Sequence, residues 1–179
     1  MFELGPATDD MKRLVGGVSD DQLGNRTPCT DWTVSELLAH IHQFTSVFTT
    51  NASKQPPRPP DGLVDDWRQA IPDDLDALAQ AWRAESAWDG QVFAGGIEMN
   101  APDNAVVAIE ELTVHGWDLA RATDQSVQID DERLDRLDGF FELFGGGPFG
   151  PTADVPQGAT RLDDTIARTG RNPSWQAVD

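Results

Sequence analysis

The hydrophobic residues of this chain recur mostly at three- and four-residue intervals, which is the spacing of an amphipathic α-helix. The clearest such segment follows Thr33, and Thr33 and Glu36 have the spacing of a capping box. Trp32 and Leu37 occupy the positions of a hydrophobic staple around that cap. One apolar face then follows, formed by Val34, Leu37, Leu38, Ile41, Phe44 and Phe48. We therefore predict a helix from Thr33 to the proline-rich break at residues 51–62.

The same spacing predicts further helices on both sides of this segment. Their expected ranges are 8–18, 64–70, 73–88, 102–122, 131–144 and 162–168. The helix over 102–122 is apolar on nearly every side, which is typical of a helix in the middle of a bundle. Residues 91–101 contain two glycines and read as an irregular crossover with at most a short extended piece. No alternating run favours a sheet, and the glycine-rich stretch 145–151 is expected to be a loop.

These elements predict an all-α protein: a four-helix bundle with a long crossover between its second and third main helices and short extra helices. At 179 residues the chain is expected to form one domain over residues 1–179. It contains no stretch of about 18 uninterrupted apolar residues, the length that a membrane helix needs. The N-terminus lacks the basic start and apolar run of a signal peptide, so we expect a cytoplasmic protein.

The net charge of the chain excludes some classes of binding partner. The formal net charge is −18, from 31 acidic and 13 basic residues. Such a field repels phosphate backbones and anionic lipids, so we expect neither nucleic-acid nor membrane binding. The single cysteine, Cys29, excludes an internal disulfide. A buried, inert thiol is the preferred interpretation of Cys29, with a reactive thiol as the alternative.

Three polar residues interrupt the apolar segment 102–122, namely Glu111, His115 and Asp118. At about 100° per residue, these three fall on one helix stripe roughly 60° wide. Such residues need partners, because burying an unpaired carboxylate costs several kcal/mol. Glu111 and His115 meet one turn apart, whereas Glu110 points about 140° away from His115. The spacing therefore selects Glu111 and His115 as a pair and excludes Glu110 from their site.

One carboxylate oxygen and one imidazole nitrogen at a common point suit zinc, nickel, iron or manganese, but they supply only two ligands. The two other histidines, His40 and His42, both lie on the helix after Thr33. They flank opposite edges of its apolar face, so either one can supply a third ligand, with His40 preferred. A Glu–His pair at this spacing is also common as an ordinary side-chain contact. A bundle without a metal therefore stays open as an alternative.

The segments that carry these residues resemble a known family. TPCTDWTVSELLAHI (27–41) and EELTVHGWDLARATDQ (110–125) resemble two signatures of the DinB-like metal-binding superfamily. The branch is that of the N-terminal metal-binding domain of mycothiol-dependent maleylpyruvate isomerase. FGPTADVPQGA followed by GRNP, within residues 149–173, resembles the ending of that branch. The resemblance spans most of the chain and implies a four-helix bundle of the DinB/YfiT type.

The resemblance also implies a site and a chemistry. Carried over by position, one divalent ion, zinc or nickel, would be bound by His40, Glu111 and His115, with His42 a bystander. Asp118 would orient a ligand histidine through its second nitrogen. Relatives use such an ion to activate a low-molecular-weight thiol such as mycothiol for transfer or isomerisation. A thiol and an electrophile are therefore the expected small-molecule partners, and a homodimer is possible because relatives are often dimers.

Two departures from the family limit what is carried over. The isomerase has a further C-terminal domain, and the segment after Asp131 is too short to form it. GGIEMNAPD (95–103) also differs from the usual crossover, so we do not expect maleylpyruvate isomerisation itself. Our leading hypothesis is a metal-dependent thiol S-transferase or isomerase of unknown substrate. The alternatives are a non-catalytic metal-binding sensor or interaction module, and a purely structural helical bundle.

Overall fold

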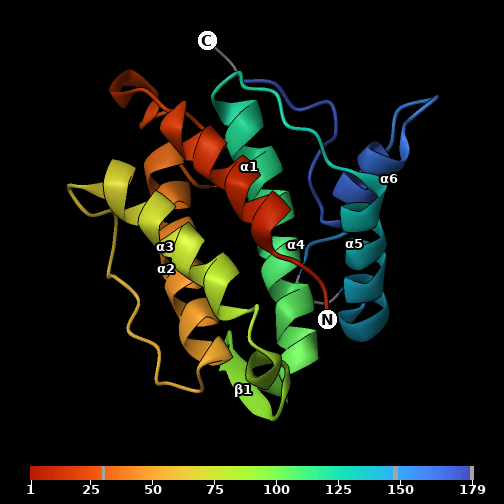
Figure 1. Ribbon diagram of the computed structural model, residues 1–179. Helices are drawn as coiled ribbons and strands as arrows, with labels where there is room; N and C mark the ends of the chain where they lie inside the picture. The colour runs from red at the N-terminus through yellow and green to blue at the C-terminus, as the bar shows by residue number, and fades with distance from the viewer. Residues whose placement is uncertain (30, 147–148, 178–179) are drawn as a thin grey trace.

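The helices confirm the predicted all-α class (Figure 1). The computed structural model describes residues 1–29, 31–146 and 149–177. Its α-helices are α1 (Gly5–Gly16), α2 (Val34–Ala52), α3 (Trp67–Ala81), α4 (Ala101–Ala122), α5 (Asp131–Phe144) and α6 (Arg161–Arg168). Short 3-10 turns lie at Asp20–Gln22 and Glu85–Trp88, and strands β1 (Gln91–Ala94) and β2 (Ile97–Asn100) form a hairpin.

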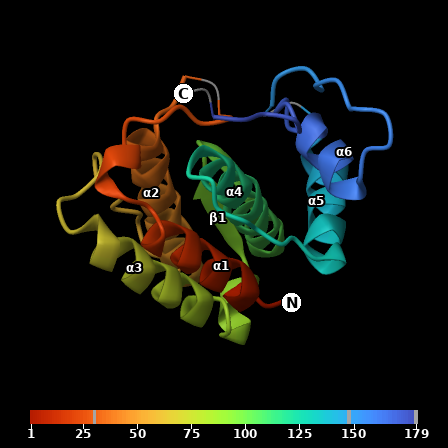
Figure 2. The ribbon, with the colours of Figure 1, turned by 90° about the horizontal axis from the view of Figure 1, so that it is seen from above.

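Four of these helices form the bundle. Helix α1 packs against α3 and α4, and α2 packs against the same two helices, so α1 and α2 lie on one diagonal of the bundle (Figure 2). Helix α5 packs against α4 outside this group of four, and α6 packs against α5. Helix α4 is therefore covered on several sides, which explains why its sequence is apolar nearly all round. Its fully buried residues include Ala101, Ala105, Ala108, Val114 and Leu119.

The capping box predicted at Thr33 begins α2. The backbone N–H of Thr33 donates to Glu36 Oε2 over 2.8 Å, and the backbone N–H of Glu36 donates to Thr33 Oγ1 over 3.3 Å. These bonds satisfy two N–H groups that a helix start otherwise leaves free. The cap thereby sets the residue at which α2 begins, and with it the position of His40 two turns later.

Two sequence predictions were wrong in the region before α4. A break was expected between residues 70 and 73, but α3 continues through Pro72 and ends at Ala81, short of the predicted Trp88. The buried side chains of Ile71 and Leu75, on either side of the proline, pack into the core and offset the hydrogen bond that Pro72 removes. No sheet was expected either, yet β1 and β2 pair antiparallel through a turn at Gly95 and Gly96. Both glycines have positive φ, which permits this tight turn.

No helix in the described part of the chain has the length and apolar character needed to cross a bilayer. The predicted loop at 145–151 includes Gly147 and Pro148, and the first signature segment includes Thr30. These three residues lie outside the described ranges.

Candidate metal centre

Three side chains from two helices meet at one point. Helix α2 carries His40, and α4 carries Glu111 and His115 one turn apart. Glu111 Oε2 lies 3.2 Å from Nε2 of His40 and 3.2 Å from Nε2 of His115. All three potential ligand atoms lie within 4.8 Å of one another. The structure thus brings together the three residues that the sequence named, and it does so where α2 and α4 pack.

Aromatic rings enclose this cluster. The Trp32 ring lies 4.8 Å from the His40 ring and 5.8 Å from the His115 ring, measured between centroids. Phe44, one turn beyond His40 on α2, lies 5.5 Å from the His40 ring and 6.3 Å from the His115 ring. The two rings flank the cluster, while the side chains of His40 and Glu111 stay 28% and 23% exposed.

Asp118 connects the cluster to the C-terminal segment. Its carboxylate accepts a hydrogen bond from Nδ1 of His115 over 2.9 Å, so the other ring nitrogen, Nε2, faces Glu111. The guanidinium of Arg171 donates to both oxygens of Asp118, with Nε to Oδ1 at 3.0 Å and Nη2 to Oδ2 at 2.9 Å. Asp118 is fully buried and Arg171 is 8% exposed, so this is a buried ion pair. It fixes the ring orientation of His115, with Nδ1 toward Asp118 and Nε2 toward Glu111.

The charges of the cluster depend on one another. Burial opposes ionisation of Glu111, but hydrogen bonds from His115 and His40 outweigh it and hold the pKa of this carboxyl well below its usual range. Burial also opposes a charge on His115, yet its bonds to Asp118 and Glu111 raise the pKa of His115 to about 9. Glu110 is the opposite case, because burial and the neighbouring charge of Glu111 raise the pKa of its carboxyl. Without a metal, His115 is therefore protonated on both ring nitrogens and carries a positive charge at neutral pH.

A cavity of about 900 Å³ opens beside the cluster. One end is polar and carries His40, Glu110, Glu111, His115 and Arg171. The remaining wall is mostly apolar and comes from α2, the β1–β2 hairpin, α5 and the segment that follows α5. This is the size of pocket that binds small organic molecules. The candidate centre therefore lies at the polar end of a chamber large enough for a substrate.

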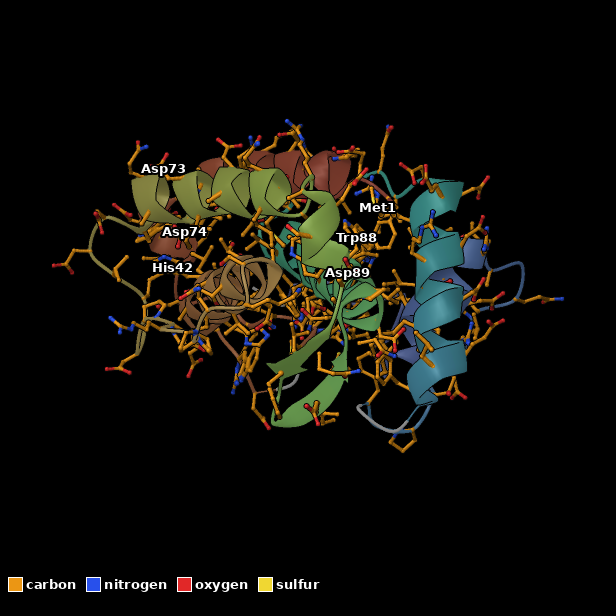
Figure 3. All side chains as sticks on the ribbon, turned by 60° about the horizontal axis from the view of Figure 1, so that its bottom comes forward. Met1, His42, Asp73, Asp74, Trp88 and Asp89 are labelled. Carbon is orange, nitrogen blue, oxygen red and sulfur yellow. The ribbon has the colours of Figure 1, made fainter. Side chains whose placement is uncertain are left out.

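His42 lies away from the centre. Its Nε2 is 3.1 Å from Asp74 Oδ2 on α3. Figure 3 shows His42 and Asp74 facing each other between α2 and α3, on the side of α2 away from α5. His42 and His40 project from different faces of α2, and only the packing of that helix decides which of the two faces α4.

Cys29 lines the cavity as a half-buried residue. Burial and the negative charge of Asp118 raise the pKa of its thiol to about 11, so the thiol is protonated at neutral pH. Its Sγ also lies within 4.8 Å of ligand atoms of His115 and Asp118. The raised pKa favours the inert interpretation of Cys29 over the reactive one.

Two residues that line the cavity were not predicted to belong to this region. The angle of Glu110 on α4 excluded it from the predicted site, and Glu110 lies outside the cluster of potential ligands. It nevertheless lines the same cavity, because the cavity is wider than the cluster. Arg171 comes from the segment after α6, and no spacing in the sequence links it to Asp118, which is 53 residues earlier. The one available signal was that a buried Asp118 needs a cation.

Fold and site together define a class: a helical bundle with a potential metal centre between its second and fourth helices. Residues 4–120 match the family described as "Mycothiol maleylpyruvate isomerase N-terminal domain". The chain belongs to this family, as the two signature segments indicated.

Individual proteins agree with this assignment. The uncharacterized proteins Rv0738 and MT0763 of Mycobacterium tuberculosis, strains H37Rv and CDC 1551, are each 29% identical to this chain over 185 residues. Each match covers 92% of this chain and 93% of the relative. Two crystal structures of mycothiol-dependent maleylpyruvate isomerase share the fold, one of them of a histidine-to-alanine mutant. Their TM-scores are 0.60 for the mutant and 0.56 for the other, with 20% and 19% identity. In both, the match covers 74% of this chain but only 64% of the isomerase chain.

Proposed function

We propose that this protein binds one divalent metal ion, zinc or nickel, through His40, Glu111 and His115. We further propose that it uses the ion to activate a low-molecular-weight thiol, as a thiol-dependent transferase or isomerase. The observation that carries the proposal is the convergence of one oxygen and two imidazole nitrogens from α2 and α4 at the polar end of a cavity. Membership of a family named for a mycothiol-dependent isomerase supports the choice of a thiol.

The three side chains fit such an ion. Two atoms that each bind a zinc ion at about 2.1 Å in tetrahedral geometry are separated by roughly 3.4 Å. The distances of 3.2 Å from Glu111 Oε2 to the two histidine nitrogens are close to this value. The bond from His115 Nδ1 to Asp118 is the outer contact that ligand histidines typically make. Three protein ligands would also leave coordination positions open toward the cavity.

The residues around the centre have separate roles in this proposal. A bound ion would supply Lewis acidity and lower the pKa of a thiol at its open position. Asp118 holds the His115 ring in place, and Arg171 keeps the Asp118 carboxylate ionised and oriented. Trp32 and Phe44 pack against the His40 ring and would hold it in position. The cavity provides room for a thiol and an electrophile side by side.

Metal binding is tested by stripping the protein with chelator, reloading it with zinc or nickel, and measuring bound metal by mass spectrometry. We expect about one equivalent in the wild type and less than a tenth of that in His40→Ala and His115→Ala. His42→Ala is the matched control, because it removes the third histidine of the chain from outside the centre, and it should bind one equivalent. Equal binding by all four proteins, or no binding by the wild type, would refute the site.

The thiol chemistry is tested separately. Metal-loaded protein is incubated with a panel of thiols that includes mycothiol, with monochlorobimane as the electrophile, and thiol consumption is followed against free metal. We expect consumption above that control, and its loss in His115→Ala. Binding of one metal equivalent without consumption of any thiol would favour the non-catalytic sensor or interaction module instead.

A further inference from the structure

Most of the cavity wall is built from aromatic and aliphatic side chains. Its apolar lining includes Phe44, Phe48, Ile97, Phe140, Phe144 and Phe149. These residues come from α2, β2, α5 and the segment after α5, so elements far apart in the chain combine to make one apolar chamber. A core would fill this space with its own side chains, whereas here about 900 Å³ is left open.

One polar side chain at the edge of this chamber has no hydrogen-bond partner within residues 1–29, 31–146 and 149–177. Glu110 is 5% exposed and lines the cavity, yet its carboxyl makes no hydrogen bond or ion pair with any described residue. Its neighbour Glu111 bonds to His40 and His115, and Asp118 bonds to His115 and Arg171. Its carboxyl oxygens keep slight exposure toward the cavity that Glu110 lines, so a polar group that enters the cavity can form a hydrogen bond with them.

The cavity offers little to a multiply charged molecule. Arg171 is the one lysine or arginine among the described residues of its wall, and its guanidinium already donates to Asp118 and to the backbone oxygen of Thr169. A dianion with one carboxylate at the metal centre would leave its second carboxylate among phenylalanine rings. Burying an unpaired carboxylate in such surroundings is strongly unfavourable.

We infer that the cavity binds an uncharged small molecule with an aromatic or similarly flat apolar body, and that the carboxyl of Glu110 hydrogen-bonds the single polar group of that molecule. The apolar body lies against the phenylalanine wall, and the polar group points to α4. Under the proposed thiol chemistry, this molecule is the electrophilic substrate of the protein. Its identification as a substrate rests on that proposed function, whereas its binding in the cavity does not.

The test uses metal-free protein, so that its outcome is independent of metal binding. Equilibrium dialysis measures Kd for 2-naphthol, which has an aromatic body and one hydroxyl, for naphthalene, which lacks the hydroxyl, and for maleate, a dianion. We expect 2-naphthol to bind with Kd below about 1 mM and more tightly than maleate. Val107→Trp places a large side chain on the cavity wall and should abolish binding of both aromatic probes.

The role of Glu110 is tested by a double-mutant-type cycle, in which a substitution of Glu110 is combined with removal of the hydroxyl group from the probe. Glu110→Leu should raise the Kd of 2-naphthol about tenfold and change that of naphthalene less than about threefold, because only the first probe loses a hydrogen bond. Glu110→Gln should leave both values within about threefold, since an amide still forms hydrogen bonds. Glu142→Leu removes an exposed carboxylate from α5 and is the matched control, expected to change neither.

Three results would overturn the inference: no binding of either aromatic probe, maleate binding as tight as that of 2-naphthol, or equal effects of Glu110→Leu on 2-naphthol and naphthalene. Failure of the proposed function looks different. In that case 2-naphthol binds the cavity as expected, but the wild type takes up no metal or consumes no thiol.

Discussion

The buried ion pair between Asp118 and Arg171 leads to a prediction about both protein stability and metal binding. Asp118→Asn keeps the size of the side chain and removes its charge. The guanidinium of Arg171, only 8% exposed, would then face a neutral amide, and His115 would lose the carboxylate that accepts from its Nδ1. The substitution should therefore weaken both the fold and the proposed metal centre.

The magnitude follows from the burial of both partners. Removing one member of a buried ion pair costs about 3–5 kcal/mol, because the other charge is left uncompensated. We expect the lower end, about 3 kcal/mol, since the Asn oxygen still accepts from Arg171. For a chain of this length, that corresponds to a fall in Tm of roughly 6–12 °C. Loss of the outer contact to a ligand histidine typically weakens metal affinity by about 10- to 100-fold.

The assay is thermal unfolding of the metal-free protein, followed by circular dichroism in the presence of chelator. Asp135→Asn is the control, because Asp135 pairs with Arg161 on the surface, and it should shift the Tm by less than about 2 °C. A double variant, Asp118→Leu with Arg171→Met, removes both charges and should be closer to the wild type in Tm than Asp118→Asn, while its metal affinity stays low. A Tm of Asp118→Asn within 2 °C of the wild type would show that the buried pair does not stabilise the fold.

Three further predictions concern proton release, the carboxyl of Glu110 and the start of α2. The pKa of His115 is raised to about 9 in the metal-free protein, so metal binding at pH 7.5 should release about one proton. The metal affinity should also fall about tenfold for each unit by which the pH is lowered. Calorimetry in two buffers that finds no proton release would contradict this. Glu110→Leu should raise the free energy of unfolding of the metal-free protein by about 1–3 kcal/mol at pH 8 and by less at pH 5. Folding raises the pKa of Glu110, so the wild-type protein loses stability as the pH rises above the pKa that Glu110 has in the unfolded chain. Urea unfolding that finds the variant less stable than the wild type at pH 8 would refute this prediction. Thr33→Ala should cost about 1 kcal/mol in the same urea assay, whereas Thr33→Ser should retain most of the cap; equal losses in both variants would show that the cap does not contribute.

Helix periodicity and capping residues predicted the parts of this protein that depend on local geometry. Helix periodicity predicted α2 and α4 with their start near the observed residues, and the capping box at Thr33 is present as expected. The same regularity put Glu111, His115 and Asp118 on one stripe of α4, because side chains three and four residues apart on a helix are neighbours whatever surrounds them. Those contacts needed no knowledge of the rest of the chain.

The contacts between separate elements, in contrast, depend on how the whole chain packs. The spacing on α2 left both His40 and His42 able to point inward, and the packing of α2 between α3 and α4 sends the first to Glu111 and the second to Asp74. The same holds for Arg171, which reaches Asp118 from the C-terminal segment, and for the open cavity that Glu110 lines. Local pattern cannot predict these contacts, because each depends on which helix faces pack together, and that choice minimises the free energy of the whole core rather than of any one segment.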